Sequence, residues 1–204
     1  MHFTLKHINN LDHLYKINLI NSVSGFKSAN LIGTKSRDNI RNVAVFSSVV
    51  HYGSCPPILG FVLRPTKVLR NTYDNIKATG CYTINHIYDG IIEEAHHTSA
   101  KYPSNISEFD KSGLKEEYLN DFYAPFVLDC SIKIGLKYLE EYHIKANNTI
   151  LILGKIVDLH IDNEIIEDDG FVNLTKGKIA AISGLDSYVI PDSNKRLGYQ
   201  RPRK

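Results

Sequence analysis

The sequence predicts a mainly β protein with short helices, folded as an antiparallel barrel. Runs of β-branched and aromatic residues recur along the 204-residue chain, and short helical patterns are inserted between them. Long helices and a regular β-α-β-α alternation are missing from the pattern. Successive strands with few helices favour an antiparallel barrel over a doubly wound parallel sheet, and they argue against a Rossmann nucleotide site.

The chain opens with a predicted helix at residues 10–20. This segment places Leu11, Leu14 and Tyr15 on one helical face, with Asn10 as its N-cap. Apolar runs bounded by polar and turn-forming residues then predict four strands. These strands are expected at residues 28–36, 42–50, 57–64 and 81–87.

The connections between these strands carry turn and helix signals. Residues 37–40, RDNI, contain Asp and Asn and predict a hairpin turn. Residues 71–80 predict a short helix with Asn71 or Thr72 as its cap and Gly80 as its C-terminal stop. A second short helix is expected at residues 89–100.

The second half of the chain predicts two long strands. Residues 126–144 and 149–161 are rich in β-branched and aromatic residues, and Asn147-Asn148 lies between them. The basic tail, about residues 190–204, is polar and is expected to be irregular. No internal repeat or low-complexity linker divides the sequence, so we expect a single domain spanning residues 1–204.

The composition is that of an ordinary soluble protein. The hydrophobic share is 43%, the charged share is 23% and the formal net charge is +2, which gives no indication of a nucleic-acid or membrane partner. The three cysteines are widely spaced and form no C-x-x-C motif, so reduced thiols are expected. The start of the chain lacks a signal-peptide pattern, and no apolar run approaches a membrane span. We therefore expect a cytoplasmic protein.

Several catalytic and metal motifs are absent from the sequence. No G-x-G-x-x-G, P-loop, G-x-S-x-G or H-E-x-x-H pattern occurs. Glu93 and His97 stand at i and i+4 of the expected helix 89–100, but two groups make an incomplete metal site. A solvated helix face explains the pair, so no metal site is predicted.

Polar residues on adjacent strands form the first candidate binding site. Ser47 and Ser48 interrupt an apolar strand on both of its faces, and Arg64 ends the next strand. With Asn71 and Thr72 at a helix N-terminus, Arg64 would make a reasonable phosphate site. The alternatives are a surface arginine, a routine helix cap, and serines that bond to the backbone.

The order of these segments resembles the flavin reductase-like family, the FMN-binding split barrels related to flavoredoxin. Each segment is a weak signal alone, but six in the same order over roughly residues 20–190 are specific. The resembling segments are NLIGTKSRDNIRNVAVFSSV, PPILGFVLRP, NTYDNIKATGCYTINHI, HHTSAKYPSNISEFDKSGL, GKIVDLHID and ISGLDSY.

The resemblance implies an antiparallel split β-barrel that forms a homodimer and holds FMN non-covalently. Carried over by position, the ring would meet Phe46, Ser47 and Ser48, and the phosphate would meet Arg64, Asn71 and Thr72. The rest of the cleft would be lined by Asn85, His86, Ser99, Ala100 and Lys101. Lys27 stands where many relatives carry the arginine of a P-R-P sequence, and a flexible ammonium does not reproduce a planar guanidinium.

The resemblance implies the activity of an NAD(P)H-dependent flavin reductase, in which NADH or NADPH passes a hydride to FMN. It also implies a partner oxygenase as a possible user of the reduced flavin. The bound flavin would carry the chemistry. No catalytic residue is therefore named, and His86 or Lys101 would tune the ring. The alternative is a flavoredoxin-type electron carrier that lacks NAD(P)H activity. A third interpretation, nucleic-acid binding through the basic tail, is disfavoured by the small net charge.

Overall fold

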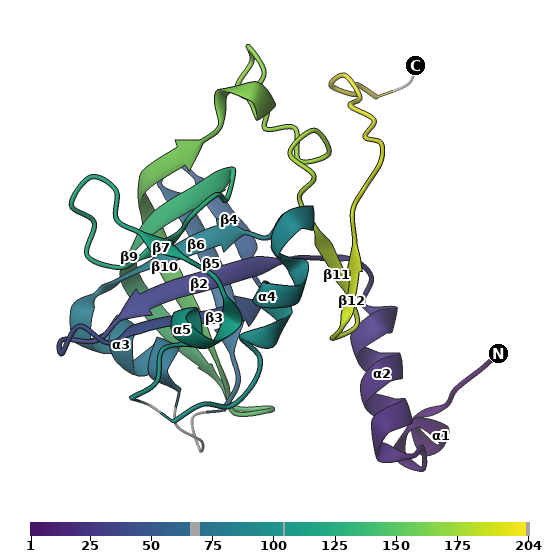
Figure 1. The fold of residues 1–204 in the computed structure, drawn as a ribbon. Helices are drawn as coiled ribbons and strands as arrows, with labels where there is room; N and C mark the ends of the chain where they lie inside the picture. The colour runs from purple at the N-terminus through teal and green to yellow at the C-terminus, as the bar shows by residue number, and fades with distance from the viewer. Residues whose placement is uncertain (66–69, 104, 203–204) are drawn as a thin grey trace.

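A seven-stranded antiparallel sheet forms the centre of the computed structural model, which describes residues 1–65, 70–103 and 105–202. The strand order is β3-β2-β6-β9-β10-β5-β4 (Figure 1), so the predicted mainly β, antiparallel class is confirmed. The strands are β2 (Asn30–Lys35), β3 (Arg41–Phe46), β4 (Val50–Ser54), β5 (Pro57–Leu63), β6 (Cys81–His86), β9 (Ile132–Ile144) and β10 (Thr149–Ile161).

The sheet curls into a barrel because its two ends are joined by a very short connection. The strands β3 and β4 stand at opposite ends of the strand order, yet only residues 47–49 link them. At about 3.3 Å per residue, the chain from Phe46 to Val50 spans at most roughly 14 Å. The ends of the sheet must therefore lie close together.

Two small sheets complete the β-structure. One joins β1 (Lys27–Ser28), β11 (Ala181–Ser183) and β12 (Ser187–Val189), and the other pairs β7 (Glu116–Glu117) with β8 (Phe126–Val127). The predicted strand 126–144 is thus divided into β8 and β9. The predicted strand 149–161 matches β10 at both ends.

Alternating side chains of the sheet fill two separate cores. The barrel interior contains Ile32 of β2, Phe61 of β5 and Ile152 of β10, all fully buried. The opposite face of β2 and β3 contributes Leu31 and Val43 to a second core, which packs against the short helices outside the barrel. A period of two along each strand explains why neighbouring residues enter different cores.

The short elements η1 (Asp89–Ile91), α4 (Ile92–His97) and α5 (Glu108–Ser112) pack on the second core, whereas α3 (Asn71–Thr79) contributes Ile76 to the barrel core. A further 3-10 turn, η2 (Asn163–Ile165), follows β10. The predicted helix 71–80 is confirmed to within one residue, and Gly80 ends it with a left-handed φ of 73°. The predicted helix 89–100 is shorter, because it consists of η1 and α4.

The N-terminal helix differs from its prediction. The chain forms α1 (Leu5–Asn9) and α2 (His13–Val23) in place of one helix at residues 10–20. The N-cap of α2 is Asp12 and the prediction of Asn10 was wrong, because the Asp12 carboxylate accepts hydrogen bonds from the amides of Leu14 and Tyr15 at 2.9 and 3.2 Å. None of the described helices is long and apolar enough to cross a membrane.

The predicted strand 42–50 is also two elements. The strand β3 ends at Phe46 and pairs with β2, whereas β4 begins at Val50 and pairs with β5. Ser47 and Ser48 therefore lie in the connection and do not interrupt a continuous strand. The hairpin predicted at residues 37–40 is confirmed, since β2 and β3 pair up to Lys35 and Arg41.

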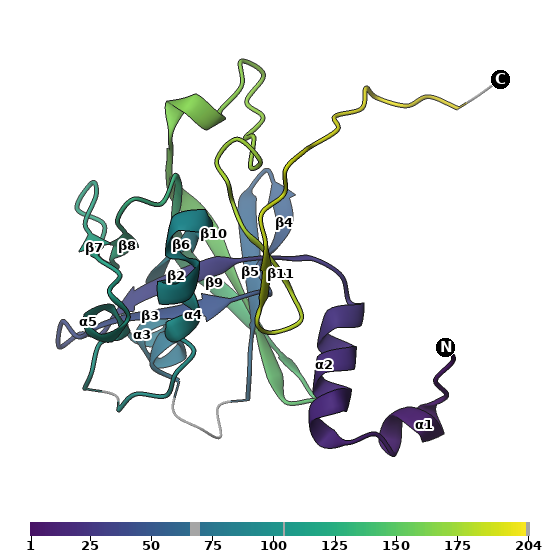
Figure 2. The same cartoon turned by 45° about the vertical axis from the view of Figure 1, so that its right-hand side comes forward.

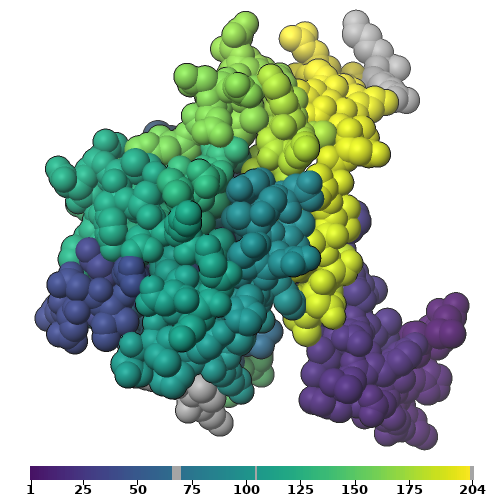
Figure 3. Space-filling model, viewed as in Figure 1, coloured from purple at the N-terminus to yellow at the C-terminus, as the bar shows by residue number. Residues whose placement is uncertain are grey.

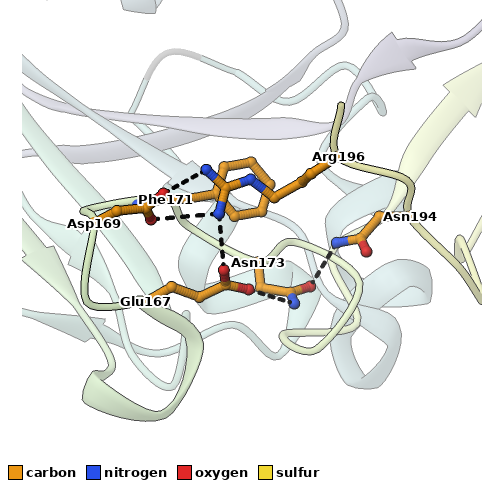
Figure 4. A network of polar contacts seen from close by, with 6 residues as sticks. All are labelled: Glu167, Asp169, Phe171, Asn173, Asn194 and Arg196. Atoms are coloured by element: carbon orange, nitrogen blue, oxygen red, sulfur yellow. Dashed lines mark hydrogen bonds and ion pairs between the residues drawn. The ribbon is translucent and has the colours of Figure 1, made fainter. Parts of the chain in front are cut away.

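The C-terminal tail is extended, but Arg196 attaches it to the loop after η2 (Figure 4). The guanidinium contacts Glu167 at 3.0 Å and Asp169 at 2.6 Å, and it lies 4.2 Å from the centre of the Phe171 ring. Beside it, Asn194 donates to Asn173 at 3.2 Å. A planar cation with two carboxylates and an aromatic face makes a well-matched attachment.

Candidate functional site

The barrel has a seam, and most of the predicted site residues lie along it. We use the word seam for the line between the free edge of β3 and the end of β5, where no strand ladder joins the sheet. Ser48 bridges one part of the seam, since its hydroxyl donates to the Val62 carbonyl at 3.0 Å and accepts from the Val62 amide at 3.1 Å. A side chain therefore replaces the missing ladder at this point.

A second bridge joins the beginning of β3 to α3. The side chains of Asn42 and Thr72 are hydrogen-bonded at 3.1 Å, and both are buried. With its amide oriented to satisfy both neighbours, Asn42 accepts from Thr72 and donates to Glu108 at 3.2 Å. The Thr72 hydroxyl is therefore engaged within the protein, behind the seam.

The free edge of β3 is capped by side chains from the helical layer. The Val43 amide donates to Glu108 at 3.4 Å, and the Val45 amide donates to the Thr98 hydroxyl at 2.9 Å. Amides on one edge of a strand recur at every second residue, so Ser47 is next in this row. Within the described chain, no protein acceptor takes the Ser47 amide.

Burial of Glu108 is the main influence on its carboxyl group. Its pKa is raised above the usual range because the group is removed from water, and the bonds that it accepts only partly offset this effect. Glu108 belongs to the S-E-F segment that contributes to the family resemblance, but no local pattern predicts its position at the edge of β3.

Three neighbouring strands place a row of polar and aromatic residues at one end of the barrel. His86 of β6, Asn30 of β2 and Phe46 of β3 are directly opposite one another, so their side chains share a face. The Phe46 ring packs edge-on against Phe61 at 5.1 Å, and it belongs to the barrel core. Burial lowers the pKa of His86 to about 4, so the imidazole is neutral near pH 7.

Asn30 is a further candidate for the site, and it is not among the residues predicted from the sequence. Its side chain is fully buried, its amide nitrogen donates to Ser28 at 2.9 Å, and its Oδ1 atom has no hydrogen-bond partner among the described residues. A buried acceptor without a partner is costly, which suggests that a ligand donor completes it. A polar residue beginning the apolar run NLIG was the available signal.

Arg64 and the start of α3 are the groups along the chain that could hold a phosphate. Arg64 follows β5 two residues after the Ser48 bridge; it is exposed, and it forms no ion pair with the described residues. The prediction that Asn71 or Thr72 caps α3 was wrong, because the helix begins at Asn71 and its N-cap is Arg70. No described side chain caps this end, so its first amides are available to an anion.

The other predicted residues divide into exposed and buried ones. Ser99, Ala100 and Lys101 are exposed and follow Thr98, which places them beside the β3 edge. Asn85 is fully buried, and its amide bonds to Leu31, Thr83 and Val127 of neighbouring segments. In this structure Asn85 stabilises the barrel and presents no free polar atom to a cleft.

Two further sequence features have structural roles. The Lys27 ammonium donates to the Asn21 carbonyl at 2.8 Å and so ties the end of α2 to β1. Glu93 and His97 border an open depression of about 250 Å³ with Lys111, and no group of three potential metal ligands occurs among the described residues.

The comparisons with known proteins agree with this architecture. Residues 24–179 match the family model of the flavin reductase like domain. A split-barrel protein from Shewanella frigidimarina NCIMB 400, assigned to the flavin reductases, is 46% identical, with a TM-score of 0.94 over 98% of this chain and 100% of that chain.

Two other solved structures share the fold at low identity. Nitrilotriacetate monooxygenase component B from Bacillus cereus is 15% identical, with a TM-score of 0.84 over 97% of this chain and 98% of that one. Flavoredoxin of Desulfovibrio vulgaris (Miyazaki F) is 21% identical, with a TM-score of 0.73 over 98% and 97%. The family model spans most of the chain, and the barrel with its seam has the family's split-barrel form. The chain therefore belongs to the flavin reductase-like family.

Proposed function

We propose that this protein binds FMN non-covalently along the seam and is an NAD(P)H-dependent flavin oxidoreductase. The observation that carries the proposal is the seam itself. It combines the Ser47 amide, the orphaned Oδ1 of Asn30, the Arg64 guanidinium and the uncapped start of α3 in a region that no ladder closes. Family membership supports the choice of a flavin.

The residues present fit the two chemically different ends of FMN. A phosphate monoester carries about −1.5 to −2 charges near neutral pH, by analogy with phosphoserine, and it suits Arg64 and the amides of Asn71 and Thr72. A flavin ring has edges with both donors and acceptors, which suit the Asn30 oxygen and the Ser47 amide. Bound flavin supplies the hydride chemistry, and the protein supplies binding and orientation.

The protein groups would act by fixed electrostatics and positioning. The Ser47 amide is preorganised by β3, so it can stabilise developing negative charge without rearrangement. Burial keeps the His86 imidazole neutral, so it places no charge beside Asn30, which lies directly opposite it on the neighbouring strand. Lys101, exposed beside the β3 edge, can attract the phosphates of a nicotinamide nucleotide. None of these residues needs to form a covalent bond.

We also propose a homodimer, with a partner oxygenase as a possible user of reduced flavin. The strands β4, β9 and β10 expose large apolar side chains, which favours association. A solved relative is component B of nitrilotriacetate monooxygenase, and this agrees with a role beside an oxygenase.

Steady-state kinetics separate the two redox functions. A flavin reductase oxidises NADH or NADPH rapidly when FMN is added, and we expect this result. A protein that binds FMN tightly but does not oxidise either nicotinamide would instead be an electron carrier like flavoredoxin, to which this fold is also similar. A protein that neither binds FMN nor oxidises either nicotinamide would contradict both functions.

A further inference from the structure

The N-terminal arm, defined here as residues 1–26, projects from the barrel. The helix α2 extends away from the sheet, and the arm forms a separate lobe at the lower right of the molecule (Figures 1, 2 and 3). Neither α1 nor α2 contains a buried residue. A helical segment that leaves its own domain in this way has its packing partner elsewhere.

The arm is apolar on more than one side. Of the eleven residues of α2, six are apolar, and they are spread around the helix. Leu14 is 69% exposed and Val23 is 72% exposed, and Phe26 at the base of the arm is equally open. A helix that is apolar around its circumference is normally buried.

The barrel of the same chain carries a matching apolar surface, which we call the outer patch. It consists of Val50 and Tyr52 on β4 together with Tyr142 and Ile144 on β9, all exposed. The register places them on the face opposite the barrel interior, since Tyr142 lies across from Leu151 and Val50 lies across from Gly60.

The arm begins next to this patch but does not cover it. The Ser28 hydroxyl donates to the Val49 carbonyl at 3.1 Å, so the base of the arm is attached where β4 begins. Phe26, two residues before Ser28, and Val50, one residue after Val49, are both exposed on either side of this attachment. Figures 1 and 2 show α2 leading away from the sheet, and none of its residues is buried.

The exposed area is larger than a compact monomer would have. A folded monomer of 23.1 kDa exposes about 9,700 Å². This chain exposes 12779 Å². The excess of about 3,000 Å² exceeds the roughly 800 Å² per partner of a standard interface.

We propose that the arm of one copy packs on the outer patch of a second copy, and that the exchange is reciprocal. This inference rests on the proposed homodimer. Both unpartnered apolar surfaces belong to the same chain, so a two-fold arrangement buries two arms and two patches at once.

Light scattering across a dilution series tests the arm directly. The variant combines Leu14→Ala with Val23→Ala, and Asn18→Ala on the same helix is the matched control. Alanine preserves helix propensity, and neither side chain is buried within its own copy, so a monomer would be unaffected. We expect at least tenfold weaker dimerisation for the double variant and wild-type behaviour for the control. Equal dimerisation of all three, or a monomeric wild type, would overturn the proposal.

Cross-linking then identifies the surface that the arm contacts. Wild-type protein in natural and heavy-isotope forms is mixed, allowed to exchange subunits and treated with a lysine-reactive cross-linker. We expect light-to-heavy links from Lys6 or Lys16 to Lys145 or Lys155, which border the outer patch. Arm links confined to single copies would contradict the exchange. An FMN titration of the same samples reports separately on the proposed function.

Discussion

At the scale of single residues, Arg64 carries the most specific claim about ligand binding. It is exposed at the end of β5 and has no ion-pair partner among the described residues. Arg64→Ala should weaken FMN binding by about 2 kcal/mol, roughly thirtyfold in Kd, because a charge-assisted hydrogen bond is lost. Fluorescence titration measures this change. Arg201→Ala, in the exposed tail, is the control, and unchanged affinity in Arg64→Ala would remove Arg64 from the site.

The two adjacent serines should behave differently. Ser48→Ala leaves the amide and carbonyl of Val62 without their partner, so it should lower the free energy of unfolding by about 1–3 kcal/mol. Ser47→Ala should change it by less than about 0.5 kcal/mol, because only the Ser47 amide is assigned a role. Urea unfolding of both variants is the measurement. Equal destabilisation would show that the Ser48 bridge is not what closes the seam.

His86 should make folding stability depend on pH. Its pKa is lowered to about 4 by burial, whereas an unfolded histidine titrates near 6.5. Between these values the unfolded chain binds a proton that the folded chain does not, so stability should fall as the pH drops from about 6.5 toward 4. His86→Asn should reduce this dependence in urea unfolding at several pH values, whereas substitution of the exposed His51 should preserve it. An unaltered profile in His86→Asn would contradict this assignment.

At the scale of secondary-structure elements, the close packing of β5 makes a further prediction. A Cβ atom at Gly60 would lie 2.6 Å from Leu153 Cδ2, 2.7 Å from Tyr52 Cε2 and 3.1 Å from the Ile152 carbonyl oxygen. Gly60→Ala should therefore destabilise the barrel by about 1–3 kcal/mol. Thermal unfolding tests this against Gly198→Ala, where a Cβ meets nothing within 4 Å. A neutral Gly60→Ala would mean that Tyr52 moves aside readily.

The elements also show what a sequence can and cannot predict. The strand β10 and the hairpin between β2 and β3 were predicted closely, because period-two patterns and turn residues are local signals. The division of residues 42–50 was missed, since Ser48 bonds to β5, fourteen residues away in sequence. The capping of the β3 edge by Thr98 and Glu108 depends on contacts more than fifty residues apart, which no local pattern encodes.

The candidate site shows the same contrast. Order along the chain led to the prediction that Ser47, Arg64 and Lys101 belong to one family site, and it stays a prediction. It could not reveal that Asn85 is satisfied within the barrel, or that Asn30 has an orphaned oxygen. Both facts depend on how the strands pair in three dimensions. The side-chain oxygen of Asn85 accepts a hydrogen bond from the Val127 amide, whereas no described group donates to Oδ1 of Asn30.

At the scale of the whole molecule, the split barrel brings three distant parts of the sequence to one seam. The connection after β3, the end of β5 with α3, and the segment after α4 meet there because the ends of the sheet are joined by residues 47–49. We propose that this seam holds FMN, and titration of the purified protein with FMN, followed by fluorescence quenching and the visible spectrum, tests this. We expect saturable quenching with one FMN per chain and a perturbed flavin spectrum. Absence of quenching, together with no flavin absorbance in the purified protein, would contradict it.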